Sequence, residues 1–196
     1  MKIEFCIRDK EAYNTACSVF ADISNISIKF DSITNATYST IISAGNSFGE
    51  MNGGVDGIIN THLSSYTPHK YIQEDVKNII NNEYIGELPV GQSILVHTNH
   101  PFHTQLIYAP TMRVAEDVST TLNAYIAFRN ALVLMKNRKI NAASTPLFCT
   151  GAGNMSLKNS CEQMKEAYKS VMTGNLINKN WIDYHTNQRY LKSYTK

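Results

Sequence analysis

The chain has 196 residues, of which 43% are hydrophobic and 17% charged, and its formal net charge is +2. This length is enough for one domain with a sizeable core, and the hydrophobic fraction is ordinary for a globular protein. The charge is too small, and the basic residues too scattered, to indicate nucleic-acid binding on their own.

Membrane insertion and disulfide chemistry are also disfavoured by the sequence. No apolar run approaches twenty residues, and no basic start leads into an apolar leader. We therefore expect a cytoplasmic monomer without membrane association, in the host cytoplasm if the source is a virus. The four cysteines, Cys6, Cys17, Cys149 and Cys161, have no CxxC spacing. They indicate neither a zinc knuckle nor a dithiol site, and we expect small buried thiols.

Strand and helix patterns alternate along the chain. In chain order the expected elements are strand 2–8, helix 10–20, strands 26–30 and 40–44, helix 55–63, a helix around 72–80 after a restart at Pro68, strands 93–98 and 105–109, helix 119–137, strand 140–145 and helix 156–172. Asp9 and Ser156 are the expected N-caps of the first and last of these helices. The alternation predicts an α/β domain with helices on both faces of its sheet. We expect this domain to span residues 1–173, with residues 174–196 as an appendage that packs partly on it.

Two glycine-rich loops stand out, and each lies between a predicted strand and a predicted helix. Seven of the ten glycines fall in residues 45–57 and 151–153. Ligands of open α/β sheets bind beyond the carboxyl ends of strands, and glycine lets backbone N–H groups approach a phosphate closely. Two such loops at one sheet edge predict a cradle for a diphosphate.

The same loops resemble the macrodomain family. Residues 43–47 (SAGNS) and 53–59 (GGVDGII) are similar to the family's N-A-A-N-type turn and its G-G-V-D-x-A-I segment. Residues 32–34, 109–113 (APTMR) and 146–155 (PLFCTGAGNM) resemble its other segments, most closely those of a bacterial and phage branch. The resemblance covers residues 26 to 172 and implies a three-layer α/β/α sandwich on a mixed, mainly parallel sheet.

The resemblance also implies that the protein binds ADP-ribose or a related NAD-derived nucleotide. By position, Asn46 and Asp56 would be catalytic and would orient the distal ribose and an attacking water. Phe48 would stack on that ribose or shield it. The ligand-binding set implied by the family is Asp31, Ser32, Ile33, Ala44, Phe48, Gly53, Gly54, Val55, Thr150, Gly151, Ala152, Gly153 and Asn154. No metal or further cofactor is implied.

This sequence departs from the family pattern at three positions. The aspartate that reads adenine in many relatives aligns with Ser32, while Asp31 lies one residue earlier. Either Asp31 takes over that task or base recognition is looser here. Ser43 and Gly45 replace the usual Asn and Ala of the turn, which makes binding a firmer expectation than hydrolysis.

Several functions remain open at this point. The protein could remove ADP-ribose from a modified protein or nucleic acid, deacetylate O-acetyl-ADP-ribose, or dephosphorylate ADP-ribose-1″-phosphate. It could instead bind the nucleotide without catalysis and so sense or sequester it. A third alternative is an interaction module whose cleft is vestigial.

Two further patterns have plainer explanations. His97, His100 and His103 have a spacing that invites a metal, but a period of three does not hold three side chains on one face of a hairpin. That spacing favours solvated turn residues. Cys149 could be a nucleophile, but no histidine partner can be assigned to it, which favours a small buried thiol.

Overall fold

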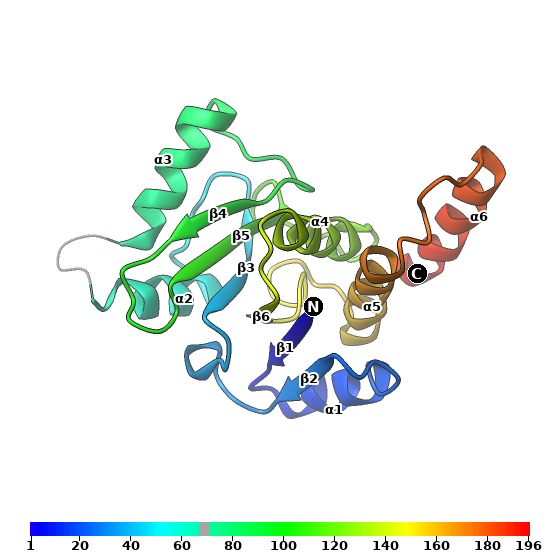
Figure 1. Ribbon diagram of the computed structural model, residues 1–196, viewed down its shortest axis with the longest axis horizontal. Coiled ribbons are helices and arrows are strands. Elements are labelled where there is room, and N and C mark those ends of the chain that lie inside the picture. Colours follow the sequence, from blue (N-terminus) through cyan, green and yellow to red (C-terminus); the bar gives the residue numbers. More distant parts are fainter. Residues whose placement is uncertain (67–70) are drawn as a thin grey trace.

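The computed structural model describes residues 1–66 and 71–196. Strands and helices alternate in chain order, as Figure 1 shows. The strands are β1 (Lys2–Cys6), β2 (Ile26–Lys29), β3 (Thr40–Asn46), β4 (Ile94–His97), β5 (Gln105–Met112) and β6 (Ala142–Thr145). The helical elements are α1 (Lys10–Val19), η1 (Ile33–Asn35), α2 (Gly54–Ser64), α3 (Ile72–Tyr84), α4 (Asn123–Asn137), α5 (Leu157–Thr173), α6 (Trp181–Leu191) and η2 (Lys192–Thr195).

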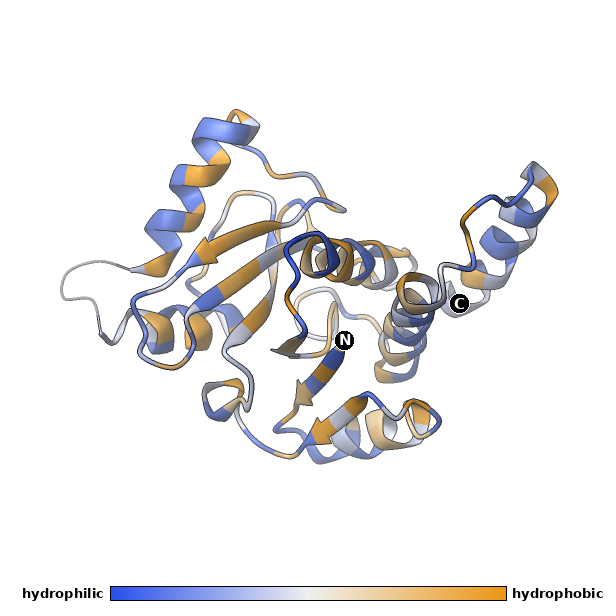
Figure 2. Cartoon of the chain, viewed as in Figure 1, coloured by the Kyte–Doolittle hydropathy of each residue, from blue (hydrophilic) through white to orange (hydrophobic). Residues whose placement is uncertain are grey.

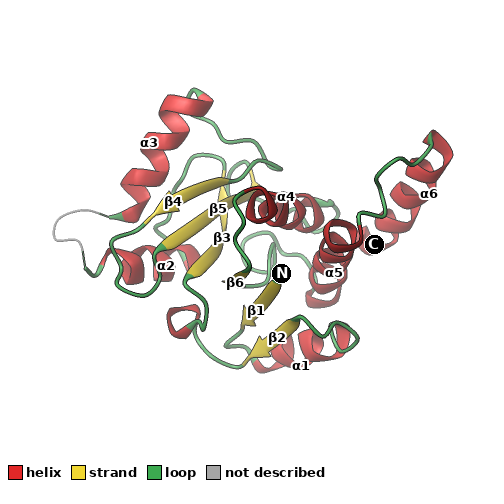
Figure 3. Ribbon diagram, viewed as in Figure 1, coloured by secondary structure: helices red, strands yellow, loops and turns green. Residues whose placement is uncertain are grey.

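The six strands form one mixed sheet in the order β2-β1-β6-β3-β5-β4. All neighbouring strands are parallel except β4, which pairs antiparallel with β5 at one edge. Helices flank the strands on both sides (Figure 3). The predicted three-layer α/β/α sandwich with a mixed, mainly parallel sheet is therefore confirmed.

Two hydrophobic cores lie on the two sides of the sheet. Residues of α1, α4 and α5 pack with Ile42 and Ile107 in one core, while residues of α2 and α3 pack with Ile41 and Leu106 in the other. Successive residues of β3 and β5 thus point to opposite cores, so β3 is covered on both faces. The hydrophobic residues gather between the layers in Figure 2, and the outer face of α3 is largely hydrophilic. None of the described helices is both long enough and apolar enough to cross a membrane.

Most predicted elements are present, with shifted ends. The helix expected from residue 119 begins only at Asn123, because Thr121 first closes a turn by donating from Oγ1 to the Val118 carbonyl at 2.7 Å. The polar loop expected after β2 contains the 3₁₀ turn η1, which Ser32 caps through Oγ. The predicted restart at Pro68 lies outside the described residues.

The N-terminal strand fixes the loop that leads into β3. Glu4 on β1 is buried, and its carboxylate accepts hydrogen bonds from Thr37 N at 2.7 Å and Thr37 Oγ1 at 2.6 Å. Ser144 Oγ on β6 donates to the same carboxylate at 2.9 Å. Cys6 Sγ donates to it as well, at 3.5 Å, so the carboxylate is well satisfied despite its burial, and it holds the segment after η1 against the sheet.

The C-terminal segment contacts the body near its end. Leu191 is 3% exposed, and Gln163 Nε2 on α5 donates to the Tyr194 carbonyl at 3.1 Å. Trp181 and Ile182 at the start of α6 are each 73% exposed. In Figure 1, α6 extends away from the sheet beyond α5.

Candidate functional site

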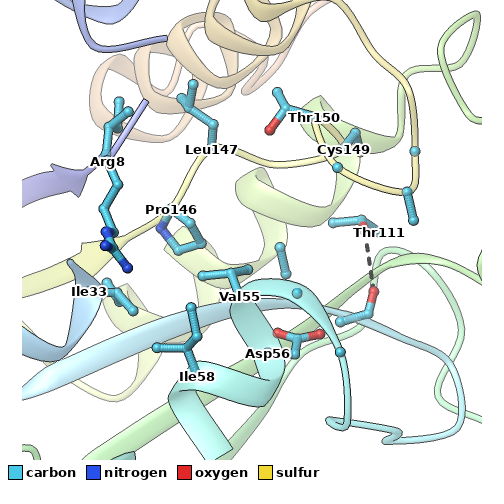
Figure 4. Close-up of a pocket in the computed structure, with 18 of the residues that line it drawn as sticks. Arg8, Ile33, Val55, Asp56, Ile58, Thr111, Pro146, Leu147, Cys149 and Thr150 are labelled. Carbon is cyan, nitrogen blue, oxygen red and sulfur yellow. Dashed lines mark hydrogen bonds between the residues drawn. The ribbon is translucent and has the colours of Figure 1, made fainter. Parts of the chain in front are cut away.

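A cavity of about 690 Å³ lies at the edge of the sheet where the parallel strands end. Its walls come from the residues after β1, the end of β3, the start of α2, the end of β5 and the loop after β6. Figure 4 shows side chains from these segments facing a common space. This is the edge at which open α/β sheets bind their ligands, and the volume is typical of small-molecule pockets.

The cavity brings together all but two of the residues that the sequence singled out. Those that line it are Asp31, Ser32, Ile33, Ala44, Asn46, Gly53, Gly54, Val55, Asp56, Thr150, Gly151, Ala152 and Gly153. They come from four separate segments of the chain, so their convergence is a property of the fold. The two glycine loops, separated by about a hundred residues in sequence, lie on the same cavity.

Phe48 and Asn154 are the two predicted residues outside the described lining of the cavity. The Arg113 guanidinium covers the ring of Phe48, with Cζ 5.0 Å from the ring centre, and Arg113 also pairs with Glu87 at 2.9 Å. Asn154 Nδ2 donates to Asp117 Oδ2 at 2.9 Å. Both residues thus support the loops of the site from outside the cavity.

The start of α2 presents bare backbone to the cavity. Gly53 is the N-cap, with φ −143° and ψ 161°, and no side chain caps the first N–H groups of the helix. A Cβ placed at Gly53 or Gly54 would meet no atom within 4 Å, so both face open space. The first N–H groups of a helix lack partners within the helix and carry its positive partial charge. This arrangement is suited to an anionic group.

The second glycine loop is held in place around Gly153. A Cβ there would lie 2.7 Å from the Cys149 carbonyl oxygen and 2.8 Å from the Val118 side chain, so only glycine fits. The Gly153 carbonyl accepts from Val118 N at 3.0 Å. Gly151, at the tip of the same loop, faces open space and lines the cavity. The loop is thus packed tightly at Gly153, whereas Gly151 remains open to the cavity.

Close packing beneath the first loop requires glycine at position 45. A Cβ at Gly45 would lie 2.1 Å from Cζ of Tyr108, which is fully buried on β5. The Tyr108 hydroxyl accepts from Asn46 N and donates to the Asn46 carbonyl, both at 2.9 Å. The replacement of the family's alanine by Gly45 is therefore matched by a tyrosine that fills the space and fixes the backbone of Asn46.

Gly45→Ala is expected to destabilise the protein by roughly 2 to 4 kcal/mol, since the rigid ring beneath it must move. Chemical denaturation measures the change. In a Tyr108→Ala background the same substitution is expected to cost less, because the clashing ring is gone. Equal costs in both backgrounds would contradict a direct steric conflict.

The side chain of Asn46 is engaged within its own loop. Its Oδ1 accepts from Phe48 N at 3.1 Å and Glu50 N at 3.3 Å, and its Nδ2 donates to the Glu50 carbonyl at 2.8 Å. Asn46 therefore shapes the turn that leads to α2, which agrees with the plainer explanation of an asparagine in a turn. It also lines the cavity.

Asp56 is a buried carboxyl group in the first turn of α2. It is 8% exposed, and Ser43 Oγ on β3 donates a short hydrogen bond to Oδ1. Burial raises the pKa of Asp56 to about 6, although the hydrogen bond from Ser43 opposes the shift. Figure 4 shows the carboxyl group beneath Val55 at the cavity wall. A carboxyl with a pKa near neutrality can accept a proton during a reaction.

Asp31 and Ser32 lie together on the cavity, and their roles differ. Asp31 Oδ1 accepts from Asn35 Nδ2 at 2.9 Å and from Ser32 N at 2.7 Å, and Lys29 Nζ lies 3.8 Å from Oδ2. The hydrogen bond from Asn35 is the main cause of a lowered pKa for Asp31, so the group is ionised at neutral pH. Ser32 Oγ caps η1 instead.

Sequence reasoning missed the residues that follow β1 and β6. Arg8 and Asp9 line the cavity from the first, and Pro146 and Leu147 from the second. Arg8 points toward Ile33 across the cavity in Figure 4. The rule that ligands bind at the carboxyl ends of strands applies to β1 as well, and it could have identified Arg8.

Cys149 lies in the wall of the cavity as a buried thiol. It is 5% exposed, and burial raises the pKa of its thiol to about 12. A thiol with this pKa remains protonated at neutral pH. The interpretation of Cys149 as a small buried thiol is confirmed.

Comparison with known proteins agrees with this geometry. The family model described as Macro domain matches residues 42–175. No protein among the curated ones matches the chain.

Solved structures resemble the fold at low sequence identity. A mutant macrodomain of Oceanobacillus iheyensis with ADPR has 23% identity, covers 70% of this chain and 72% of its own, and has a TM-score of 0.59. The macrodomain of Mycobacterium tuberculosis DarG has 14% identity, covers 71% and 86%, and also has a TM-score of 0.59. Thermosipho africanus DarTG in complex with ADP-ribose has 13% identity, covers 83% and 50%, and has a TM-score of 0.53.

Proposed function

The chain belongs to the macrodomain family, and from this premise we propose that its cavity binds ADP-ribose or a close derivative. The observation that carries the proposal is the convergence of two glycine loops on one cavity, with Gly53 and Gly151 facing open space. A diphosphate fits between them, because each loop can place backbone N–H groups on one phosphate. Two solved relatives with similar folds are described with ADPR or ADP-ribose.

We place the two ends of the nucleotide in the cavity from the charged side chains that line it. We place adenine beside Asp31, whose ionised carboxylate can accept from the exocyclic amine, and beside Arg8, which can lie over the base. The distal ribose then reaches Asn46 and Asp56 at the opposite end. Between the alternatives left open by the sequence we propose Asp31, and the capping of η1 by Ser32 Oγ supports this choice.

Asp31→Asn is expected to weaken ADP-ribose binding roughly tenfold, the usual effect of losing a charged hydrogen-bond acceptor. Ser32→Ala is expected to weaken it less than about threefold. Calorimetric titration of both variants measures the difference. The hypoxanthine analogue of ADP-ribose lacks the exocyclic amine and should bind wild type about tenfold more weakly than ADP-ribose does. In Asp31→Asn the two nucleotides should bind with equal affinity, because the acceptor for the amine is gone. A larger effect at Ser32 than at Asp31 would contradict the assignment.

We further propose that the protein hydrolyses a bond at the distal ribose. Asp56 supports this, since a buried carboxyl with a pKa of about 6 beside the cavity can activate water. Candidate leaving groups are a modified side chain or nucleic acid, an acetyl group and a phosphate. Binding without hydrolysis is the second candidate, and it is favoured by Asn46, whose amide is engaged within its own loop.

A further inference from the structure

Three histidines from two distant segments form a cluster away from the nucleotide cavity. His62 lies near the end of α2, and His100 and His103 lie in the turn between β4 and β5, which runs beside α2 in Figure 1. One ring nitrogen from each of the three lies within 4.8 Å of the others. The prediction of solvated turn residues is wrong, because His100 is 7% and His103 3% exposed. Only His97 of the three fits that prediction, since it is exposed at the end of β4.

Hydrogen bonds define how the rings are oriented. His103 Nε2 lies 3.2 Å from the Ala36 carbonyl, and because a carbonyl only accepts, this nitrogen carries the proton. His103 Nδ1 is then left with its lone pair directed at His62 Nε2, 2.8 Å away. His100 Nδ1 accepts from the backbone N–H groups of Phe102 and His103, at 3.2 Å and 2.9 Å.

From this arrangement we propose that His62, His100 and His103 form a site for Zn²⁺ or a chemically similar transition-metal ion. His62 Nε2 and His103 Nδ1 are the primary ligands, and His100 is the third after its ring turns away from its backbone donors. Imidazole nitrogen is a preferred ligand of zinc, copper and nickel, whereas calcium and magnesium prefer oxygen.

The distances and the second layer of contacts fit a metal. With zinc–nitrogen bonds of about 2.0 to 2.1 Å, two ligands of a tetrahedral ion are separated by about 3.3 Å. The 2.8 Å separation of His62 Nε2 and His103 Nδ1 needs only a small opening to reach this value. A histidine that ligates a metal commonly donates its other N–H to a carbonyl, as His103 does to Ala36.

A purely structural role explains the burial of these histidines less completely than a metal site does. The buried imidazoles of His100 and His103 and the half-buried one of His62 need hydrogen-bond partners, and the same packing could be achieved with apolar side chains at lower cost. Here two unlike segments direct ring nitrogens at one point, and aromatic rings enclose them, with Tyr66 edge-on to His100 and Phe102 edge-on to His103. A metal at that point would tie the end of α2 to the β4–β5 turn. The start of the same helix forms part of the nucleotide cavity.

The test is metal titration of the full chain after treatment with a chelator. Zn²⁺ at about a hundredfold excess over its dissociation constant is expected to raise Tm by roughly 5 to 10 °C. Co²⁺ is expected to give visible absorption bands typical of nitrogen ligation, and Mg²⁺ and Ca²⁺ no shift. His62→Gln and His103→Gln should bind zinc at least roughly a hundredfold more weakly, and His100→Gln roughly tenfold. His97→Gln is the matched control and should bind as wild type does.

Unchanged metal binding in His62→Gln and His103→Gln would overturn the proposal, as would a wild-type protein that shows neither the Zn²⁺ shift nor the Co²⁺ bands. Equal loss in His97→Gln would also overturn it, because the metal would then lie elsewhere. If His103→Gln fails to fold, His62→Gln decides the question, since His62 is only half-buried. Titration with ADP-ribose in His62→Gln should remain unchanged, which separates this site from the nucleotide cavity.

Discussion

Gly53→Val is expected to weaken ADP-ribose binding at least a hundredfold while leaving the fold intact. The backbone of Gly53 is extended, at φ −143° and ψ 161°, so valine adopts it without strain. A Cβ at this position meets no protein atom within 4 Å, and Gly53 lines the cavity, so we expect the valine side chain to occupy part of the space that we assign to the diphosphate. A displaced diphosphate loses several hydrogen bonds to N–H groups, each worth about 1.5 to 3 kcal/mol when one partner is charged.

The stability of Gly53→Val serves as the control that its fold is intact. Thermal unfolding should change by only a few degrees, because the replaced residue is an N-cap that has no side-chain bond to lose. Gly151→Val, which also faces open space, should have the same pair of effects from the other loop. Full affinity in both folded variants would show that the nucleotide does not lie between the loops.

Asp56→Asn is expected to reduce hydrolysis by at least a hundredfold and to spare most of the affinity for ADP-ribose. The neutral amide cannot accept a proton from water, and a positioned general base typically contributes about 10² to 10⁴ in rate. In wild type, turnover should rise with pH through about 6, where Asp56 ionises, and level off above it. The rise of turnover near pH 6 should be absent from the residual activity of Asp56→Asn. Equal loss of affinity and turnover would contradict the assigned role, and absence of turnover in wild type would select the binding-only alternative.

The same variant is expected to be more stable than wild type at neutral pH. The pKa of Asp56 rises from 3.8 to about 6 on folding, mainly through burial, so folding disfavours the ionised group. The contribution of Asp56 to stability is therefore most favourable below pH 4, falls as the pH rises from about 4 to about 6, and stays low above that range. Asparagine removes this cost, which amounts to at most about 3 kcal/mol at 1.4 kcal/mol per pKa unit. Denaturation at pH 8 and pH 4 should show a gain that is present only at pH 8.

The sequence was informative wherever a local pattern decides the structure. Alternating apolar residues predicted β1 and β2, and Asp9 and Ser156 are the N-caps of α1 and α5. The glycine loops indicated the cavity because glycine marks both a tight turn and an exposed backbone. The order of the family's motifs then placed distant segments on one site.

Such local patterns could not predict contacts between residues that are distant in the sequence. The role of Gly45 depends on Tyr108, which lies on another strand, and nothing near Gly45 in sequence signals a buried ring. The histidine spacing in the β4–β5 turn favoured solvated side chains, whereas the fold buries His100 and His103 beside His62 of α2. Arg8 was missed because it follows a short strand that carries no glycine loop.

Calorimetric titration of wild type with ADP-ribose, ADP and AMP tests the central claim most directly. We expect micromolar binding of ADP-ribose, weaker binding of ADP, which lacks the distal ribose, and the weakest binding of AMP, which lacks the second phosphate as well. This order follows from a cavity that holds a diphosphate between its loops and a ribose beside Asn46 and Asp56. No measurable heat with ADP-ribose, together with no shift in Tm, would contradict the account and would leave the cavity as a remnant of the scaffold.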